Sequence, residues 1–188
     1  AERLAPHLVA VVGRLVPTPL MGGVGARDDP AQQHHDLADH QFNELAALVD
    51  VPLINMESAV NHPCQGLADW KTLDDLDIPS QGGKFVLSWS WHPQPMPLAI
   101  PAATVHMAAM RGMEVTVLRP QGYELPDLIM ERARAAATLS GGSVTETDNR
   151  QIAMEGAHVV YVNSWTSQRH YGDIRAEDDF KHELRNWC

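Results

Sequence analysis

Short apolar runs alternate with helical patterns along much of the chain, and this alternation constrains the fold most strongly. Strands are predicted at residues 84–89, 113–118 and 157–162. Helices are predicted between them at about residues 102–111 and 126–140, each followed by glycine, which commonly ends a helix. Strands that are joined by helices form parallel sheets with right-handed crossovers. The sequence therefore predicts an α/β fold with parallel sheets and flanking helices.

The first third of the chain shows the same alternation. Residues 8–13 and 51–56 are apolar runs that indicate strands, residues 36–48 have near-helical spacing, and residues 17–30 are typical of a loop. A further helix is expected from Pro63, because proline suits the first helical turn. The polar stretch 74–83 indicates a linker, so we expect one domain part in residues 1–74 and another in 75–188, with no single sheet continuing across the linker.

The charge balance excludes several classes of partner. The chain has 14 Lys and Arg against 24 Asp and Glu, a formal net charge of -10, which argues against binding nucleic acid or an anionic membrane. Its apolar runs are shorter than the roughly 20 residues that cross a bilayer.

Cys64 and Cys188 form no CxxC pair, which is typical of a reducing compartment, so we expect a cytoplasmic location. His34, His35 and His40 lack ligand partners at suitable spacing, and no metal site is expected.

The densest cluster of chemically useful side chains lies in residues 56–65, between a predicted strand and a predicted helix. His62 and Gln65 are three residues apart and share a face of the first helical turn. Together they could hydrogen-bond a carbonyl oxygen and an amine, as the attack of an amine on a carbonyl group requires. For an isolated His-Pro pair, the simpler interpretation is that His62 caps the helix and Gln65 is solvated.

A longer string favours the chemical interpretation. The run His62-Pro63-Cys64-Gln65, followed by Leu67-Ala68-Asp69, resembles the His-Pro-x-Gln-x-Leu-Ala-Asp signature of aspartate and ornithine transcarbamylases. Residues 54–57, 89–93 and 159–165 look most like the N-acetylornithine and N-succinylornithine branch of that family. The resemblance implies a transcarbamylase-like fold with parts of two domains, and a knot through the Pro-rich run 92–97.

The resemblance also implies roles for individual residues. His62 and Gln65 would be catalytic and would contact the carbamoyl group, and Arg14 would hold carbamoyl phosphate. Glu57 would contact the acylated ornithine, and His92 would belong to the substrate-binding set. Without the resemblance, Arg14 is equally well explained as a solvated side chain, Glu57 is better explained as one, and the Pro-rich run is a stiff surface loop.

At the level of the whole enzyme, the resemblance implies transfer of a carbamoyl group from carbamoyl phosphate to the side-chain amine of N-acetylornithine, giving N-acetylcitrulline and phosphate in arginine biosynthesis. It implies no cofactor and no metal, and a homotrimer. Residues 1–74 would be the C-terminal part of the carbamoyl phosphate-binding domain. Residues 75–188 would be the acceptor-binding domain, incomplete at its C-terminal end.

The sequence departs from the family in three ways. Asn163 stands where the family usually has lysine, one extra residue separates Glu57 from His62, and neither a Ser-x-Arg-Thr-Arg nor a His-Cys-Leu-Pro loop is found. We expect these loops in flanking sequence and expect the 188-residue chain alone to be inactive. Alternatives are an N-succinylornithine or ornithine carbamoyltransferase, or a non-catalytic binding or assembly module. Cys64 is expected to be a small buried residue and not a nucleophile.

Overall fold

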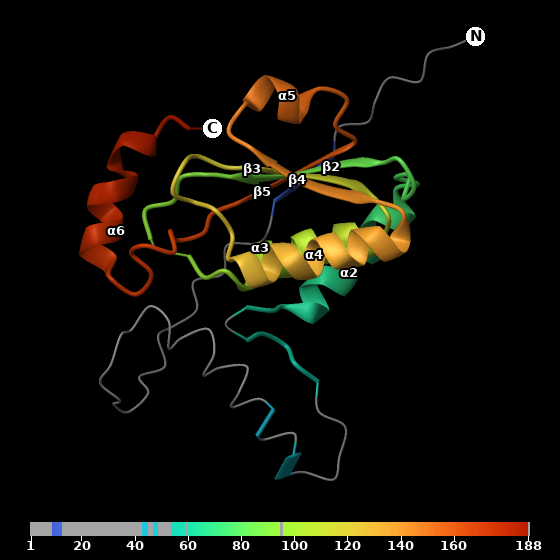
Figure 1. Ribbon diagram of the computed structural model, residues 1–188, viewed down its shortest axis with the longest axis horizontal. Coiled ribbons are helices and arrows are strands. Elements are labelled where there is room, and N and C mark those ends of the chain that lie inside the picture. Colours follow the sequence, from blue (N-terminus) through green and yellow to red (C-terminus); the bar gives the residue numbers. More distant parts are fainter. Residues whose placement is uncertain are drawn as a thin grey trace.

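A five-stranded parallel sheet forms the centre of the computed structural model, with strand order β1-β5-β2-β3-β4 (Figure 1). The structure describes residues 9–12, 43–44, 47–48, 54–58, 60–94 and 96–187. The strands are β1 (Val9–Val12), β2 (Lys84–Trp89), β3 (Glu114–Leu118), β4 (Ser143–Thr147) and β5 (Val159–Asn163). The predicted α/β class with a parallel sheet is confirmed. The predicted knot stays a prediction.

Helices cover both faces of this sheet. The helices α2 (Pro63–Asp75), α3 (Ala99–Met110) and α4 (Asp127–Ser140) lie on one side, and α5 (Arg150–Met154) lies on the other (Figure 1). The helix α6 (Ile174–Lys181) and the 3-10 turn His182–Leu184 lie beside the sheet. Among the described residues, no helix is long and apolar enough to cross a membrane.

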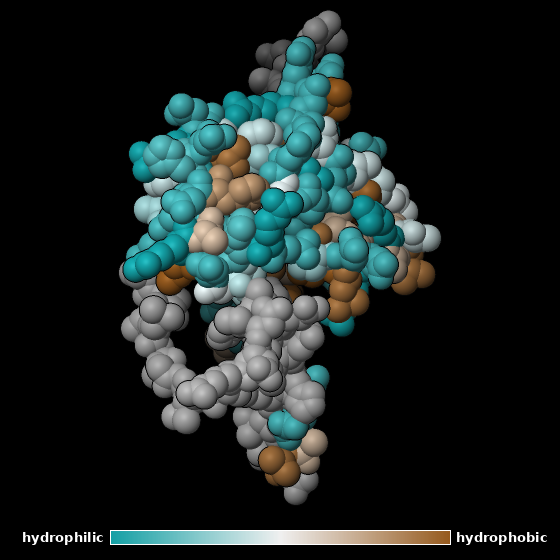
Figure 2. All heavy atoms as spheres, turned by 60° about the vertical axis from the view of Figure 1, so that its left-hand side comes forward, coloured by the Kyte–Doolittle hydropathy of each residue, from teal (hydrophilic) through white to brown (hydrophobic). Residues whose placement is uncertain are grey.

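The apolar core follows from burial of the sheet on both faces. In β2, every residue from Phe85 to Trp89 is buried, as expected of a central parallel strand. The larger core lies under the three-helix face, and a smaller one on the opposite face joins Val86, Leu118 and Val160 to Ala153 of α5. The outer surface is largely hydrophilic where Figure 2 shows it, with small separate apolar patches.

The sequence located the helices of this core closely. The helix α4 ends at Gly141, whose φ of 82° is left-handed, as the Gly141-Gly142 pair predicted. The helix α3 begins at Ala99, three residues before the predicted start, because Pro101 lies in the first turn, where a missing N–H costs nothing.

Two predictions about the first part of the chain are wrong. The predicted strand at residues 51–56 is absent from its described part, since Ile54 and Met56 are irregular and 71% and 65% exposed. The first strand, β1, was expected in a sheet separate from the strands after Gly83, but it pairs with β5 in the same sheet. Without β1, β5 would be the edge strand of the sheet and would leave a row of backbone N–H and C=O groups unpaired. Pairing with β1 satisfies these groups. The division into 1–74 and 75–188 itself stays a prediction, because most of the first 53 residues lie outside the described ones.

The polar stretch after α2 is an anchored turn, although its composition indicated a linker. The Arg111 side chain is 3% exposed, and its Nη2 donates to Asp74 Oδ1 and to the carbonyl oxygen of Ile78, both at 2.6 Å. Gln81 Nε2 donates to the carbonyl oxygen of Ser140 at 2.8 Å. The turn therefore fixes α2 against the end of α3 and the end of α4.

Two adjacent glycines in this turn allow a matched test. A Cβ atom on Gly83 would collide with the backbone carbonyl of Pro79, whereas one on Gly82 would meet nothing within 4 Å and would only strain a φ of 69°. We expect Gly82→Ala to lower the free energy of unfolding by about 1 kcal/mol and Gly83→Ala to lower it by more than about 3 kcal/mol. Urea unfolding followed by tryptophan fluorescence measures both. Equal stability of the two variants would contradict this packing.

Candidate functional site

The order of the strands reverses beside β2, and this places two chain segments at one edge of the sheet. From β2 the chain passes to β3 and β4 on one side, and β5 then pairs with β2 on the other side. Trp89 and Asn163, the last residues of β2 and β5, are register partners. In open parallel sheets, ligands bind at the carboxyl ends of strands at such a reversal. The segments that follow β2 and β5 are therefore candidates for binding a ligand.

Hydrogen bonds join these two segments to each other. The backbone N–H of Ser90 donates to the carbonyl oxygen of Asn163 at 2.8 Å. The backbone N–H of Thr166 and its Oγ1 donate to the carbonyl oxygen of Met96 at 3.0 and 2.8 Å. The buried indole of Trp89 donates to the carbonyl oxygen of Trp165 at 2.9 Å. The two segments thus form one structural unit.

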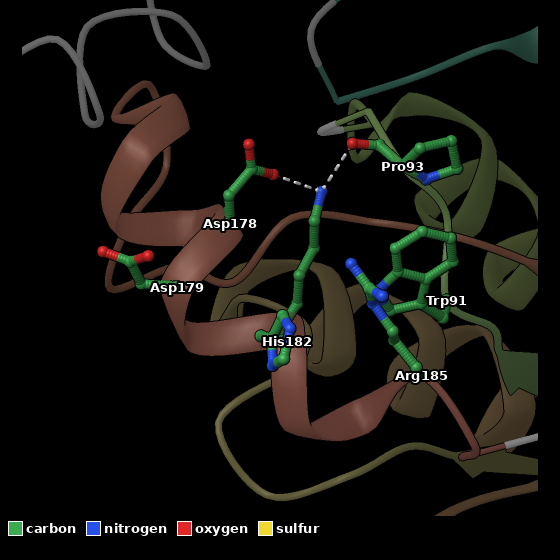
Figure 3. Close-up of a pocket in the computed structure, with 7 residues that line it drawn as sticks. Trp91, Pro93, Asp178, Asp179, His182 and Arg185 are labelled. Carbon is green, nitrogen blue, oxygen red and sulfur yellow. Dashed lines mark hydrogen bonds and ion pairs between the residues drawn. The ribbon is translucent and has the colours of Figure 1, made fainter.

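His92 lies in the first of these segments, between Trp91 and Pro93, which both line a pocket that Figure 3 shows. The pocket is lined by Trp91, Pro93, Asp178, Asp179, Lys181, His182 and Arg185. Lys181, with a side chain only 5% exposed, donates from Nζ to the carbonyl oxygen of Pro93 at 3.1 Å and pairs with Asp178 at 2.8 Å. The backbone N–H of Gln94 donates to His92 Nδ1 at 3.1 Å. The Pro-rich segment is thereby held against α6.

The amino end of α2 carries the other candidate residues. His62 occupies the N-cap position of α2, but its side chain makes no capping hydrogen bond. His62 Nε2 lies 4.0 Å from Glu57 Oε2, and His62 Nδ1 is buried without a hydrogen-bond partner among the described residues. The two side chains lie beside each other, and their roles in binding stay predictions.

Gln65 is held by a buried carboxylate. Its Nε2 donates to Asp69 Oδ1 at 2.8 Å, and Asp69 is 5% exposed, so the interpretation of Gln65 as a freely solvated side chain is wrong. Burial raises the pKa of Asp69, and contacts with Gln65, Tyr161 and His62 partly oppose this rise. Burial and the neighbouring Asp69 charge raise the pKa of Tyr161, so its hydroxyl stays protonated.

The predicted site residues fall into two groups in the structure. Glu57, His62 and Gln65 lie together at the amino end of α2, whereas His92 follows β2, and no described contact joins it to the first group. Arg14 lies outside the described residues. Asp69 was missed as a functional candidate, although it stands in the signature and four residues after Gln65, a spacing that brings side chains together on a helix. Tyr161 gave no such signal, because it comes from a distant strand.

Acidic, histidine and cysteine side chains do not gather into a group of three or more that could hold a metal ion within the described part of the chain. Cys64 is half-buried, and its Sγ lies 3.7 Å from the carbonyl oxygen of Asn55. His34, His35 and His40 lie outside the described residues.

Comparisons with known proteins point to one family. Residues 101–187 match the model of the Asp/Orn-binding domain of aspartate/ornithine carbamoyltransferases. The N-acetylornithine carbamoyltransferase of Xanthomonas campestris pv. campestris is 34% identical over 189 residues, which cover 99% of this chain and 55% of that protein. The ornithine carbamoyltransferase of Halalkalibacterium halodurans is 34% identical over 124 residues, covering 66% of this chain and 37% of the relative.

Solved structures agree with these relatives. A variant of N-acetyl-L-ornithine transcarbamylase complexed with PALAO superposes with a TM-score of 0.76 at 31% identity, covering 83% of this chain and 47% of that one. Another N-acetyl-L-ornithine transcarbamylase structure has a TM-score of 0.74 at 27% identity and covers 94% of this chain and 60% of its own. The chain spans about half the length of the curated relatives that it matches.

The raised pKa of Asp69 gives a pH-dependent test of its burial. The folded state binds the Asp69 proton more tightly than the unfolded state, so this stabilisation is complete below about pH 4 and is lost as pH rises through the raised pKa. Asp69→Asn removes this titration. We expect the free energy of unfolding of the native protein, minus that of the variant, to fall as pH rises from about 4. Urea unfolding at several pH values measures the difference, and a constant difference would contradict the burial of the carboxylate.

Proposed function

We propose, because the chain belongs to the aspartate/ornithine carbamoyltransferase family, that it forms part of an enzyme that transfers the carbamoyl group of carbamoyl phosphate to the side-chain amine of N-acetylornithine. The observation that carries this proposal is the arrangement of His62 and Gln65 at the amino end of α2, both partly accessible and both beside a carboxylate partner. The products are N-acetylcitrulline and phosphate.

The chemistry needs a polarised carbonyl group and a leaving group that can accept charge. As the neutral amine of the acceptor attacks and the new C–N bond forms, negative charge grows on the carbamoyl oxygen, and a donor such as His62 stabilises it. The C–O bond to phosphate then breaks, phosphate leaves with the electron pair of that bond, and the amine gives up its proton to the departing phosphate. Gln65 contacts the same carbamoyl group. The free backbone N–H groups at the amino end of α2 favour a bound anion, which supports placing the phosphate there. Arg14 is proposed to pair with that phosphate through its planar donor fork.

The acceptor is proposed to bind between Glu57 and the joined segments after β2 and β5. Related solved structures support the choice of ligands, since one is complexed with carbamyl phosphate and N-succinyl-L-norvaline. His92 and the region of Asn163 lie at the reversal of strand order, where a ligand would reach them. Asn163 replaces the usual lysine with a neutral donor, so it is proposed to hydrogen-bond the acceptor without a charge.

The larger assembly is proposed on the same basis. We infer that residues 1–74 belong to the carbamoyl phosphate-binding domain and residues 75–188 to the acceptor-binding domain, and that the enzyme acts as a cytoplasmic homotrimer in arginine biosynthesis. The match of residues 101–187 to an Asp/Orn-binding domain supports the assignment of the second part.

Replacing His62 or Gln65 with alanine in the full-length protein is expected to lower kcat about 100-fold or more, because loss of one such donor removes stabilisation that acts only in the transition state. The free energy of unfolding should change little in His62→Ala, since that side chain is partly accessible. Gln65→Ala should also lower the thermal midpoint, because it removes the hydrogen bond to the buried Asp69 carboxylate. Lys71→Ala is a matched control, because Lys71 is an exposed residue of the same helix. Steady-state production of citrulline derivatives measures the effect. Unchanged turnover in both variants would remove these residues from the mechanism.

The proposed acceptor makes a second prediction about the full-length protein. We expect kcat/KM for N-acetylornithine to exceed that for free ornithine, because a site that desolvates and pairs the acyl amide rejects an analogue that leaves those groups unpaired. N-succinylornithine is assayed beside them to separate the two acylated acceptors. Faster carbamoylation of free ornithine would contradict the proposed acceptor and leave the carbamoyl-transfer chemistry standing.

A further inference from the structure

We propose that Asp69 is a positioning residue that fixes which end of the Gln65 carboxamide faces the substrate. The inference rests on the proposed function, because it assigns Gln65 a defined orientation toward the carbamoyl group. It begins from the contact between Gln65 Nε2 and Asp69 Oδ1, which measures 2.8 Å. The two residues are one helical turn apart on α2, so their side chains meet on the same face of the helix.

The chemistry of the acceptor determines the orientation of the amide. A carboxamide has a donor end and an acceptor end of nearly the same shape, and either end can turn inward. An ionised carboxylate only accepts hydrogen bonds, so it selects the Nε2 end of Gln65. The Oε1 end must then turn away from Asp69 toward the accessible side of the residue. A hydrogen bond to a charged acceptor is stronger than one between neutral groups, and it holds this orientation firmly.

The carboxylate is itself held in place from the other side. Asp69 is 5% exposed, and the buried Tyr161 from β5 faces it, with the buried Thr104 from α3 next to the Tyr161 hydroxyl. Asp69 Oδ2, Thr104 Oγ1 and the Tyr161 hydroxyl make no hydrogen bond of ordinary geometry among the described residues, so Gln65 is the partner with a well-formed bond to the carboxylate. His62 on the same helix and Tyr161 are the titratable groups that act on it.

This orientation of the Gln65 amide gives Gln65 and His62 different hydrogen-bonding roles toward the carbamoyl group. With its oxygen outward, Gln65 accepts a hydrogen bond and so matches the –NH2 of a carbamoyl group. The carbamoyl oxygen needs a donor, and His62 is the neighbouring side chain that can supply one. If the Gln65 amide were reversed, Gln65 and His62 would both be donors for the carbamoyl oxygen. The carbamoyl –NH2 would then have no acceptor. Asp69 therefore acts on the reaction through Gln65 and does not touch the substrate.

A direct experiment follows the side-chain amide protons of Gln65 by NMR hydrogen exchange. In the native chain they should exchange at least about tenfold more slowly than those of exposed Gln151, because they are bonded to a buried carboxylate. Asp69→Asn should abolish this protection, since an Asn side chain accepts Nε2–H or donates to Oε1 and no longer selects one end. Gln81, whose Nε2 donates to a backbone carbonyl of Ser140, should be unchanged. Equal exchange at Gln65 and Gln151 in the native chain would overturn the proposal.

A double-mutant cycle in the full-length protein separates positioning from plain structural support. Asp69→Asn is expected to lower kcat about tenfold or more in the native background, because the amide orientation is lost. In the Gln65→Ala background it should lower kcat no further, since no amide is left to orient. Asp75→Asn is the matched control, because Asp75 is an exposed residue of α2 that pairs with Lys71. Equal loss of kcat in both backgrounds would overturn the proposal and leave Asp69 a structural residue.

The two experiments also separate this inference from the proposed function. If the native full-length protein transfers no carbamoyl group, the proposed function fails, and the exchange rates still decide whether Asp69 holds Gln65. If transfer is observed and Gln65 exchanges freely, the enzyme assignment stands and the positioning role fails.

Discussion

The parallel arrangement of all five strands is the constraint on which the rest of the structure depends. It places every carboxyl strand end at one edge of the sheet and leaves both faces to be covered. The three helices α2, α3 and α4 cover one face of the sheet, and α5 covers the other (Figure 1). The reversal of strand order between β2 and β5 makes this edge a candidate binding site, because the two hydrogen-bonded segments that follow these strands lie there.

The helix that carries His62 and Gln65 is attached to this framework partly through polar contacts. Leu73 is buried, but Leu67 of the same helix is 71% exposed, and Asp69 occupies an inward position where an apolar residue would pack. A buried carboxylate costs stability unless its hydrogen bonds offset the loss of water. This offset is incomplete, because Asp69 accepts a bond from Gln65 at Oδ1 while its Oδ2 has no hydrogen-bond partner among the described residues. A buried carboxylate in the middle of α2, one turn after Gln65, is better explained by function than by packing.

Sequence reasoning succeeded where local signals and burial agreed. The strand around Val86 has an apolar run, the strand around Val117 alternates apolar and polar residues, and Gly141 marks the end of α4, so each was placed within one or two residues. It failed where a tertiary contact overrode composition. The polar strand β4 was missed because its pairing with β3, and not its own residues, makes it a strand. The turn around Ile78 was taken for a linker because Arg111, which anchors it, comes from a distant helix.

In the candidate site, too, local sequence signals were predictable and tertiary contacts were not. The signature string singled out His62 and Gln65. In the structure His62 is the N-cap residue of α2 without a side-chain capping bond, and Gln65 donates to Asp69. The environment of Asp69 could not be predicted, because Tyr161 lies 92 positions further along the chain and meets it only when β5 pairs with β2. Local spacing predicts which residues share a helix face, and only the fold shows what that face meets.

A second buried carboxylate holds the segment after β5 in place, as Asp69 holds the Gln65 side chain of α2. Glu177 of α6 is 1% exposed and accepts hydrogen bonds from the Tyr123 hydroxyl at 2.8 Å and from Ser167 Oγ at 2.6 Å. Burial and the Glu177 charge raise the pKa of Tyr123, which keeps its hydroxyl a donor. Lys181 of the same helix donates a hydrogen bond to the carbonyl oxygen of Pro93, so α6 contacts both segments that follow β2 and β5. Segments that are already fixed before a ligand arrives lose little conformational freedom on binding, so this side of the candidate site is preorganised.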